Sequence, residues 1–143
     1  MTKTARHTNP IADWLFREFV SMLKADRVRI LRKRWLVDPD ASSRVALRGL
    51  MDPELRQPKG WAYIFINPAK QVHKRRDDEV GTLIHELAHV LLPKTSERKI
   101  LRIEDILTKT FTREQRAILK QFIPRHEVKH YPRQPALRTS RAI

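Results

Sequence analysis

The sequence has 143 residues, 41% of them hydrophobic, and its 30 Lys and Arg against 16 Asp and Glu give a formal net charge of +14. This length suits one small domain with tails, and no apolar run approaches the roughly 18 residues that a membrane-spanning helix needs. The N-terminus has no apolar segment typical of a secretory signal, and the absence of cysteine excludes disulfides and thiolate ligands. We therefore expect a cytoplasmic protein with no membrane partner, in which a transition metal can be held only by His, Asp and Glu.

The first half of the chain predicts a helix and then strands. After a flexible N-terminus at 1–8, Asn9 and Pro10 form a typical helix start. A helix over 10–24 is predicted by apolar residues at helical spacing, namely Ile11, Trp14, Leu15, Phe19, Met22 and Leu23. Residues 27–37 alternate between apolar and basic side chains and predict a strand.

That strand carries the densest basic cluster of the chain, consisting of Arg27, Arg29, Arg32, Lys33 and Arg34. We interpret the cluster as a solvated strand face or a charged edge that resists aggregation, in preference to a phosphate-contacting patch. Basic residues are also spread along the rest of the chain. The net charge is thus compatible with contact to nucleic acid or to an acidic protein without deciding between them.

The middle of the chain contains the clearest strand. Residues 38–43 predict a turn, 45–47 a short strand, and 49–60, with two prolines and two glycines, a loop. The run WAYIFI at 61–66 then has apolar residues on both faces, which predicts a strand that is covered on each side.

The next helix, from Asp77 or Asp78 to Pro93, contains the pattern HExxH. With His85 set to zero and about 100° per residue, His89 falls at about 40° and Glu86 at about 100°. The apolar residues of the helix fall at roughly 140–260°, on the other side of the helix. This arrangement predicts an apolar back packed on the core and a polar front that faces a cleft.

Two more helices and a tail follow. Ser96 is a suitable N-cap for a helix over about 97–109, and Thr112 with Gln115 predicts a capping box for the last helix. Glu97 and Glu104 are seven residues apart and share one stripe at the border of the apolar arc. Residues 125–143 predict a basic C-terminal tail after a domain spanning 9–124.

The HExxH helix favours a metal site. Two histidines four residues apart on a helix can bind one Zn²⁺, and Glu86 between them can polarise a metal-activated water. A catalytic zinc usually has a third protein ligand. Glu97 and Glu104 are the leading candidates, and the geometry of a simple helical hairpin does not choose between them. His73, His126 and His130 are weaker candidates.

The stretch LIHELAHVLLPKTSERKI resembles the zincin metallopeptidases, and in particular small metallopeptidases of phages and bacteria. The resemblance implies a minimal zincin-like α+β fold, with an N-terminal helix, a small twisted sheet, the HExxH helix and a glutamate-bearing helix. It implies Zn²⁺ bound by His85, His89 and Glu97, peptide-bond hydrolysis with Glu86 as general base, and WAYIFI as an edge strand that pairs with an extended substrate. It also implies a second oxyanion donor, a role for which Tyr63 and Tyr131 are the only tyrosines.

Two other interpretations remain open at the level of sequence. The chain could be a basic nucleic-acid-binding module, or an inactive zincin scaffold with a structural zinc. The first predicts that Glu86→Gln leaves function intact, while charge reversals among residues 27–34 abolish it. The peptidase interpretation predicts the opposite.

Overall fold

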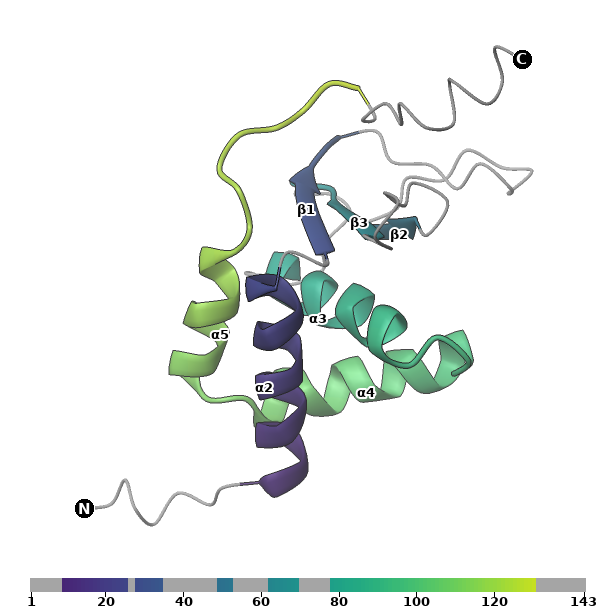
Figure 1. The fold of residues 1–143 in the computed structure, drawn as a ribbon, viewed down its shortest axis with the longest axis vertical. Helices are drawn as coiled ribbons and strands as arrows, with labels where there is room; N and C mark the ends of the chain where they lie inside the picture. Colours follow the sequence, from purple (N-terminus) through teal and green to yellow (C-terminus); the bar gives the residue numbers. More distant parts are fainter. Residues whose placement is uncertain (1–8, 26–27, 35–48, 53–61, 70–77, 131–143) are drawn as a thin grey trace.

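The computed structural model of the chain describes residues 9–25, 28–34, 49–52, 62–69 and 78–130, and Figure 1 shows their arrangement. Within these ranges the protein is a small α+β fold, as predicted. Its helices and strands, labelled as in Figure 1, are α2 (Pro10–Lys24), β1 (Val28–Arg32), β2 (Gly49–Asp52), β3 (Ala62–Ile66), α3 (Asp78–Leu91), α4 (Glu97–Thr110) and α5 (Arg113–Gln121). No helix in these ranges is both long enough and apolar enough to cross a bilayer.

The three strands form one sheet in the order β1-β3-β2. The central strand β3 pairs in parallel with β1, from Val28 opposite Ala62 to Arg32 opposite Ile66. On its other side it pairs antiparallel with β2, with Gly49 opposite Ile66. The prediction that WAYIFI is an edge strand is therefore wrong. Its apolar residues on both faces reflect a central position, where backbone pairing on both sides accompanies cover on both faces.

Strand β2 lies inside the segment that the sequence predicted as a loop, at 49–60. A strand of only four residues that begins with glycine has too little local pattern to be recognised, because its pairing with β3 supplies the stabilisation. The predicted strand at 45–47 lies outside the described residues, as do Arg27, 35–37 and Trp61.

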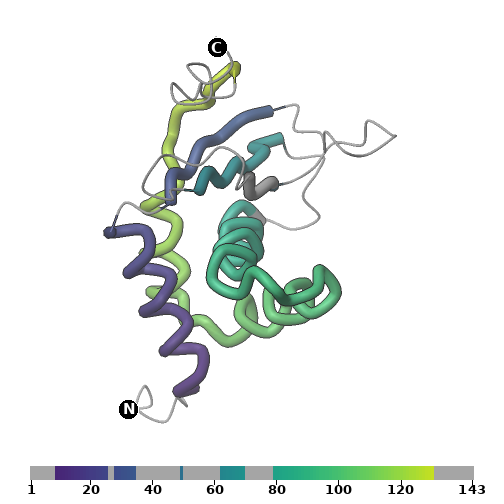
Figure 2. Tube along the Cα trace, turned by 45° about the vertical axis from the view of Figure 1, so that its right-hand side comes forward, coloured from purple at the N-terminus to yellow at the C-terminus, as the bar shows by residue number. Residues whose placement is uncertain are grey.

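Helix α3 is the centre of the packing. It lies against β2 and β3 on one side, and α4 runs along its opposite side, while α2 and α5 stand side by side at one end (Figures 1 and 2). The fully buried side chains come from every layer and include Phe19, Ile64, Ile66, Leu83, Ile84, Leu87, Ile100 and Leu119. The apolar back predicted for α3 thus forms the middle of one continuous core.

Local signals fix the ends of the helices. The Asn9 side chain accepts a hydrogen bond from the Ala12 amide at 3.0 Å, which caps α2 as predicted. Ser96 caps α4 through the Lys99 amide, and Thr112 and Gln115 form the predicted reciprocal capping box of α5. Helix α3 ends at Leu91, two residues before Pro93, because a proline disfavours helical backbone in the residue that precedes it.

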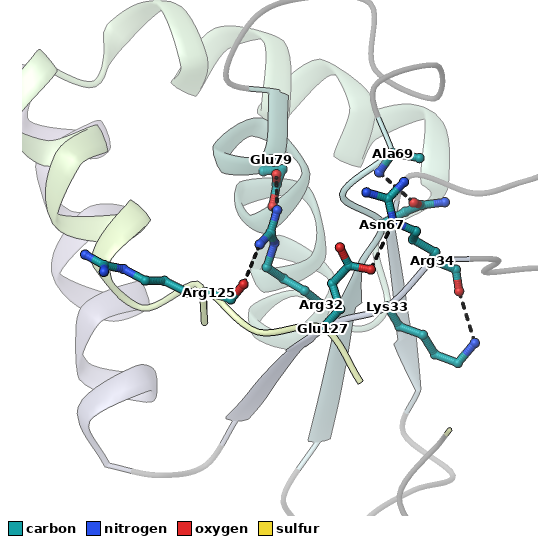
Figure 3. Close-up of polar contacts among 8 residues, drawn as sticks. All are labelled: Arg32, Lys33, Arg34, Asn67, Ala69, Glu79, Arg125 and Glu127. Carbon is teal, nitrogen blue, oxygen red and sulfur yellow. Dashed lines mark hydrogen bonds and ion pairs between the residues drawn. The ribbon is translucent and has the colours of Figure 1, made fainter. Parts of the chain in front are cut away.

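Three residues of the basic cluster, Arg32, Lys33 and Arg34, have partners within the fold (Figure 3). Arg32 makes a bidentate contact with Glu79 of α3, at 3.0 and 3.1 Å, and its Nη1 donates to the Arg125 carbonyl at 2.8 Å. Arg34 pairs with Glu127 at 3.0 Å, and Lys33 is buried with its Nζ donating to the Arg34 carbonyl. These contacts tie β1 and the residues that follow it to α3 and to the segment after α5.

The segment 125–130, which the sequence assigns to the basic tail, lies beside β1. The Val128 amide donates to the Arg32 carbonyl at 2.8 Å, and Arg32 forms a parallel bridge with Glu127. The rest of the predicted tail, 131–143, lies outside the described residues.

Candidate metal centre

Helix α3 presents the HExxH residues between two neighbouring elements. His85 and Glu86 are buried, at 5% and 7% exposure, and His89 is half-buried. The predicted polar front therefore does not face an open cleft along its whole length, because α4 and β2 pack over it. His89 and Glu97 form its accessible end.

Helices α3 and α4 run in opposite directions, so that two glutamates of α4 reach the histidines of α3. Glu97 Oε1 lies 2.7 Å from His89 Nε2, and Glu97 Oε2 lies 3.1 Å from His85 Nε2. The two imidazole rings approach edge to face, with their centroids 4.9 Å apart. The carboxylate of Glu97 thus bridges the two Nε2 atoms.

Glu104 contacts the other side of the same histidine. Its Oε1 lies 2.9 Å from His85 Nδ1, and its side chain is 14% exposed, against 60% for Glu97. An Nδ1–H that donates to Glu104 fixes the ring orientation and leaves the Nε2 lone pair for a metal, as is common for metal-bound histidines. The two glutamates that the sequence left as alternatives therefore occupy different positions around one histidine.

The electrostatics of this pair of helices raise the pKa of His85. Burial of the ring acts in the opposite direction and is the largest single effect. The effect of burial is outweighed by the hydrogen bond that His85 Nδ1–H donates to Glu104, together with the negative charges of Glu86, Glu97 and Glu104. Three carboxylates thus surround one imidazole, and such a concentration of negative charge favours any cation at this position, whether a proton or a metal.

Glu86 lies on the side of α3 that faces β2. A Cβ added to Gly49 would come within 3.1 Å of Glu86 Oε2 and would clash with the Thr82 Cγ2 methyl. Glycine at the start of β2 therefore allows this strand to approach the HExxH helix at the general-base candidate. Gly49 was not predicted as part of the site, and its only signal in the sequence is a glycine that precedes the apolar pair Leu50-Met51.

The residues brought together fit a divalent metal. His85, His89 and Glu97 each offer one ligand atom, and the three atoms lie within 4.8 Å of one another. In a tetrahedral zinc site with bonds of about 2.0 Å, ligand atoms are about 3.3 Å apart. The contacts of Glu97 with His89 and His85, at 2.7 and 3.1 Å, are shorter than this, so the side chains must separate to admit an ion. Among the described residues, this is the group that could hold one.

The weaker candidates are not part of this group. His126 and His130 are exposed in the segment beside β1, and Tyr63 lies on the central strand with its ring stacked on Phe65 at 6.2 Å. His73 and Tyr131 lie outside the described residues.

Comparisons with protein-family models, with curated proteins and with solved structures found no match for this chain.

Proposed function

We propose that this chain is a zinc-dependent metallopeptidase with a minimal zincin-like fold. The observation that carries the proposal is the convergence of His85, His89 and Glu97 within 4.8 Å, with Glu86 on the same helix. Two imidazoles and one carboxylate form a ligand set that suits a catalytic zinc, in which the fourth position stays open. The 60% exposure of the Glu97 side chain supports access from solvent to that position.

In this proposal His85, His89 and Glu97 hold the metal, and Glu104 positions His85 through Nδ1. A bound zinc lowers the pKa of water toward about 7 and polarises a carbonyl. Glu86, which is buried beside β2, accepts a proton from the attacking water and passes it to the leaving amine.

The strand that would align a peptide is β2 rather than WAYIFI. β2 is an edge of the sheet within the described residues, and Gly49 brings it against Thr82 and Glu86. Main-chain hydrogen bonds to such an edge give affinity that depends little on side chains.

The direct test compares the zinc-loaded wild-type protein with Glu86→Gln on a mixture of unfolded proteins, with cleavage products identified by mass spectrometry. We expect cleavage by the wild type, at least 100-fold slower cleavage by Glu86→Gln, and equal zinc content in both. Equal or absent cleavage with zinc bound in both would contradict the peptidase and favour an inactive scaffold.

A nucleic-acid-binding module receives less support. Arg32 and Arg34, which belong to the densest basic cluster, are already paired with Glu79 and Glu127. The nucleic-acid-binding module would be favoured over the peptidase by two results together. Charge reversal of these arginines would abolish binding to a DNA duplex, and Glu86→Gln would leave that binding unaffected.

A further inference from the structure

Helix α4 has a row of side chains on its solvent side, next to the proposed zinc ligand. With Glu97 set to zero, Leu101 falls at about 40°, Arg98 at about 100° and Arg102 at about 140° around the helix. The buried residues Ile100 and Leu107 fall at about 300° and 280°. The two arginines are exposed and one turn apart, and Leu101 is 47% exposed between them and Glu97. We call Arg98, Leu101 and Arg102 the α4 ridge.

The positive charge of the ridge is not balanced by the acidic residues of its own helix. Within the described ranges, neither Arg98 nor Arg102 has an ion-pair partner. Glu97 and Glu104 are engaged with the histidines, and Asp105 pairs with Lys109 at 3.3 Å. This differs from β1, where Arg32 and Arg34 each have a carboxylate partner.

The spacing along the ridge suits an extended peptide. Residues four apart on a helix are separated by about 6.0 Å along its axis. Alternate residues of an extended chain point to the same side and are about 6.6–6.8 Å apart. Two carboxylates at alternate positions of a peptide can therefore meet Arg98 and Arg102, and an apolar side chain of the same peptide can contact Leu101.

We infer that the α4 ridge binds an acidic segment of the protein substrate, with carboxylates at Arg98 and Arg102 and an apolar side chain on Leu101. The inference rests on the proposed peptidase function, and it defines the substrate class as acidic, unfolded or extended polypeptide. A nucleic acid fits the ridge less well, because binding to its backbone depends on cations that neutralise phosphates, whereas the ridge offers two cations with an apolar side chain beside them.

The test measures binding without turnover. It uses the full-length zinc-loaded chain with Glu86→Gln and two fluorescein-labelled peptides, one with glutamates at alternate positions and one with lysines in their place. The ridge variant is Arg98→Glu/Arg102→Glu. The control is Arg17→Glu/Arg113→Glu, which changes the net charge equally at exposed positions of α2 and α5, away from the α3–α4 turn (Figure 1).

We expect the acidic peptide to bind and the lysine peptide not to bind. In the ridge variant the affinity for the acidic peptide falls about tenfold, and in the control it changes less than threefold. Leu101→Asp is expected to weaken binding of the same peptide about fivefold, whereas Ile11→Asp, at a position 71% exposed on α2, leaves the affinity unchanged.

Several results would overturn the inference. One is an equal loss in the ridge variant and the control, which would mean that only net charge matters. Another is the absence of acidic-peptide binding. A third is binding of a single-stranded DNA oligonucleotide that is lost in the ridge variant while peptide binding is unaffected.

Failure of the inference is distinguishable from failure of the proposed function. If the wild type cleaved unfolded proteins with no preference for acidic segments, the proposed role of the α4 ridge would be contradicted and the proposed peptidase function would stand. Binding of the acidic peptide at the ridge, without cleavage above that of Glu86→Gln, would support the ridge and contradict the peptidase.

Discussion

His85 is the residue on which the site depends, because it contacts both glutamates of α4. Its Nε2 faces Glu97, which also reaches His89, and its Nδ1 faces Glu104. The sequence predicts that both glutamates lie on one stripe of their helix. It could not assign their roles, because these depend on how far α4 is shifted along α3, and no local pattern contains that shift.

The two glutamates are expected to respond differently to mutation. Glu97→Ala removes a proposed ligand and should abolish zinc binding, whereas Glu104→Ala should weaken it about 10–100-fold by releasing the His85 ring. Glu104→Gln should retain most of the affinity, because its amide oxygen can still accept from Nδ1–H. Competition with a chromophoric chelator measures all three. Equal losses from Glu97→Ala and Glu104→Ala would show that their assignment is wrong.

The stability of the metal-free protein is expected to depend on pH through His85. Because the pKa of His85 in the folded metal-free protein is raised above 6.5, protonation of this ring stabilises the fold. That contribution is complete below the unfolded-state pKa of about 6.5 and is lost as pH rises through the folded-state pKa.

The measurement is urea unfolding of the chelator-treated protein over a pH series, with His85→Gln as the control. The difference in unfolding free energy between wild type and His85→Gln should shrink as pH rises from 6.5. If the difference in unfolding free energy grew as pH rose above 6.5, the pKa of His85 would not be raised in the folded protein. With zinc present, the contribution of His85 to the unfolding free energy should instead grow as pH rises, because metal and proton compete for Nε2.

At the scale of elements, the contact between β2 and α3 joins the sheet to the site. Gly49 permits it, because any side chain there meets the Thr82 methyl and approaches the Glu86 carboxylate. The sequence predicted the helices well, since Asn9, Ser96 and the Thr112–Gln115 box are local signals that act within a few residues. It located β1 and β3 but missed β2 and placed β3 at an edge, because the existence of β2 and the central position of β3 depend on partners distant in the chain.

Gly49→Ala should therefore lower the free energy of unfolding by about 1–3 kcal/mol through overpacking against Thr82. Thr82→Ser removes the clashing methyl and keeps the hydroxyl, so the double variant Gly49→Ala/Thr82→Ser should recover most of the loss. Gly81→Ala serves as a control, because its added Cβ would lie 3.4 Å from Glu104 Oε2, an ordinary contact. Urea unfolding measures the free energy of unfolding of each variant. If the losses from Gly49→Ala and Thr82→Ser simply added in the double variant, the Thr82 methyl would not be what opposes a side chain at position 49.

At the scale of the whole molecule, Arg32 connects three parts of the chain. It binds Glu79 at the start of α3 and the Arg125 carbonyl after α5, while its own backbone pairs with β3 (Figure 3). The sequence identified a basic cluster and favoured a solvated strand face or a charged edge, whereas Arg32 and Lys33 have partners within the fold. It did not reveal the partners, which lie 47 and 93 residues away.

Arg32→Met keeps the apolar stem and removes the guanidinium, so it should cost about 1–3 kcal/mol by leaving Glu79 and the Arg125 carbonyl without this donor. The matched variant Arg34→Met, whose pair with Glu127 is exposed, should cost less than about 1 kcal/mol. Thermal and urea unfolding compare the two. Equal costs would argue that Arg32 contributes no more than an ordinary surface ion pair.

We propose that His85, His89 and Glu97 form a metal site, and elemental analysis after incubation with zinc and gel filtration tests this site most directly. The samples are the wild type, His85→Ala, Glu97→Ala and Glu104→Ala, each checked for folding by circular dichroism. We predict about one zinc per chain in the wild type, none in His85→Ala or Glu97→Ala, and partial occupancy in Glu104→Ala. A wild-type protein without zinc, or zinc retained equally in all four proteins, would contradict the site.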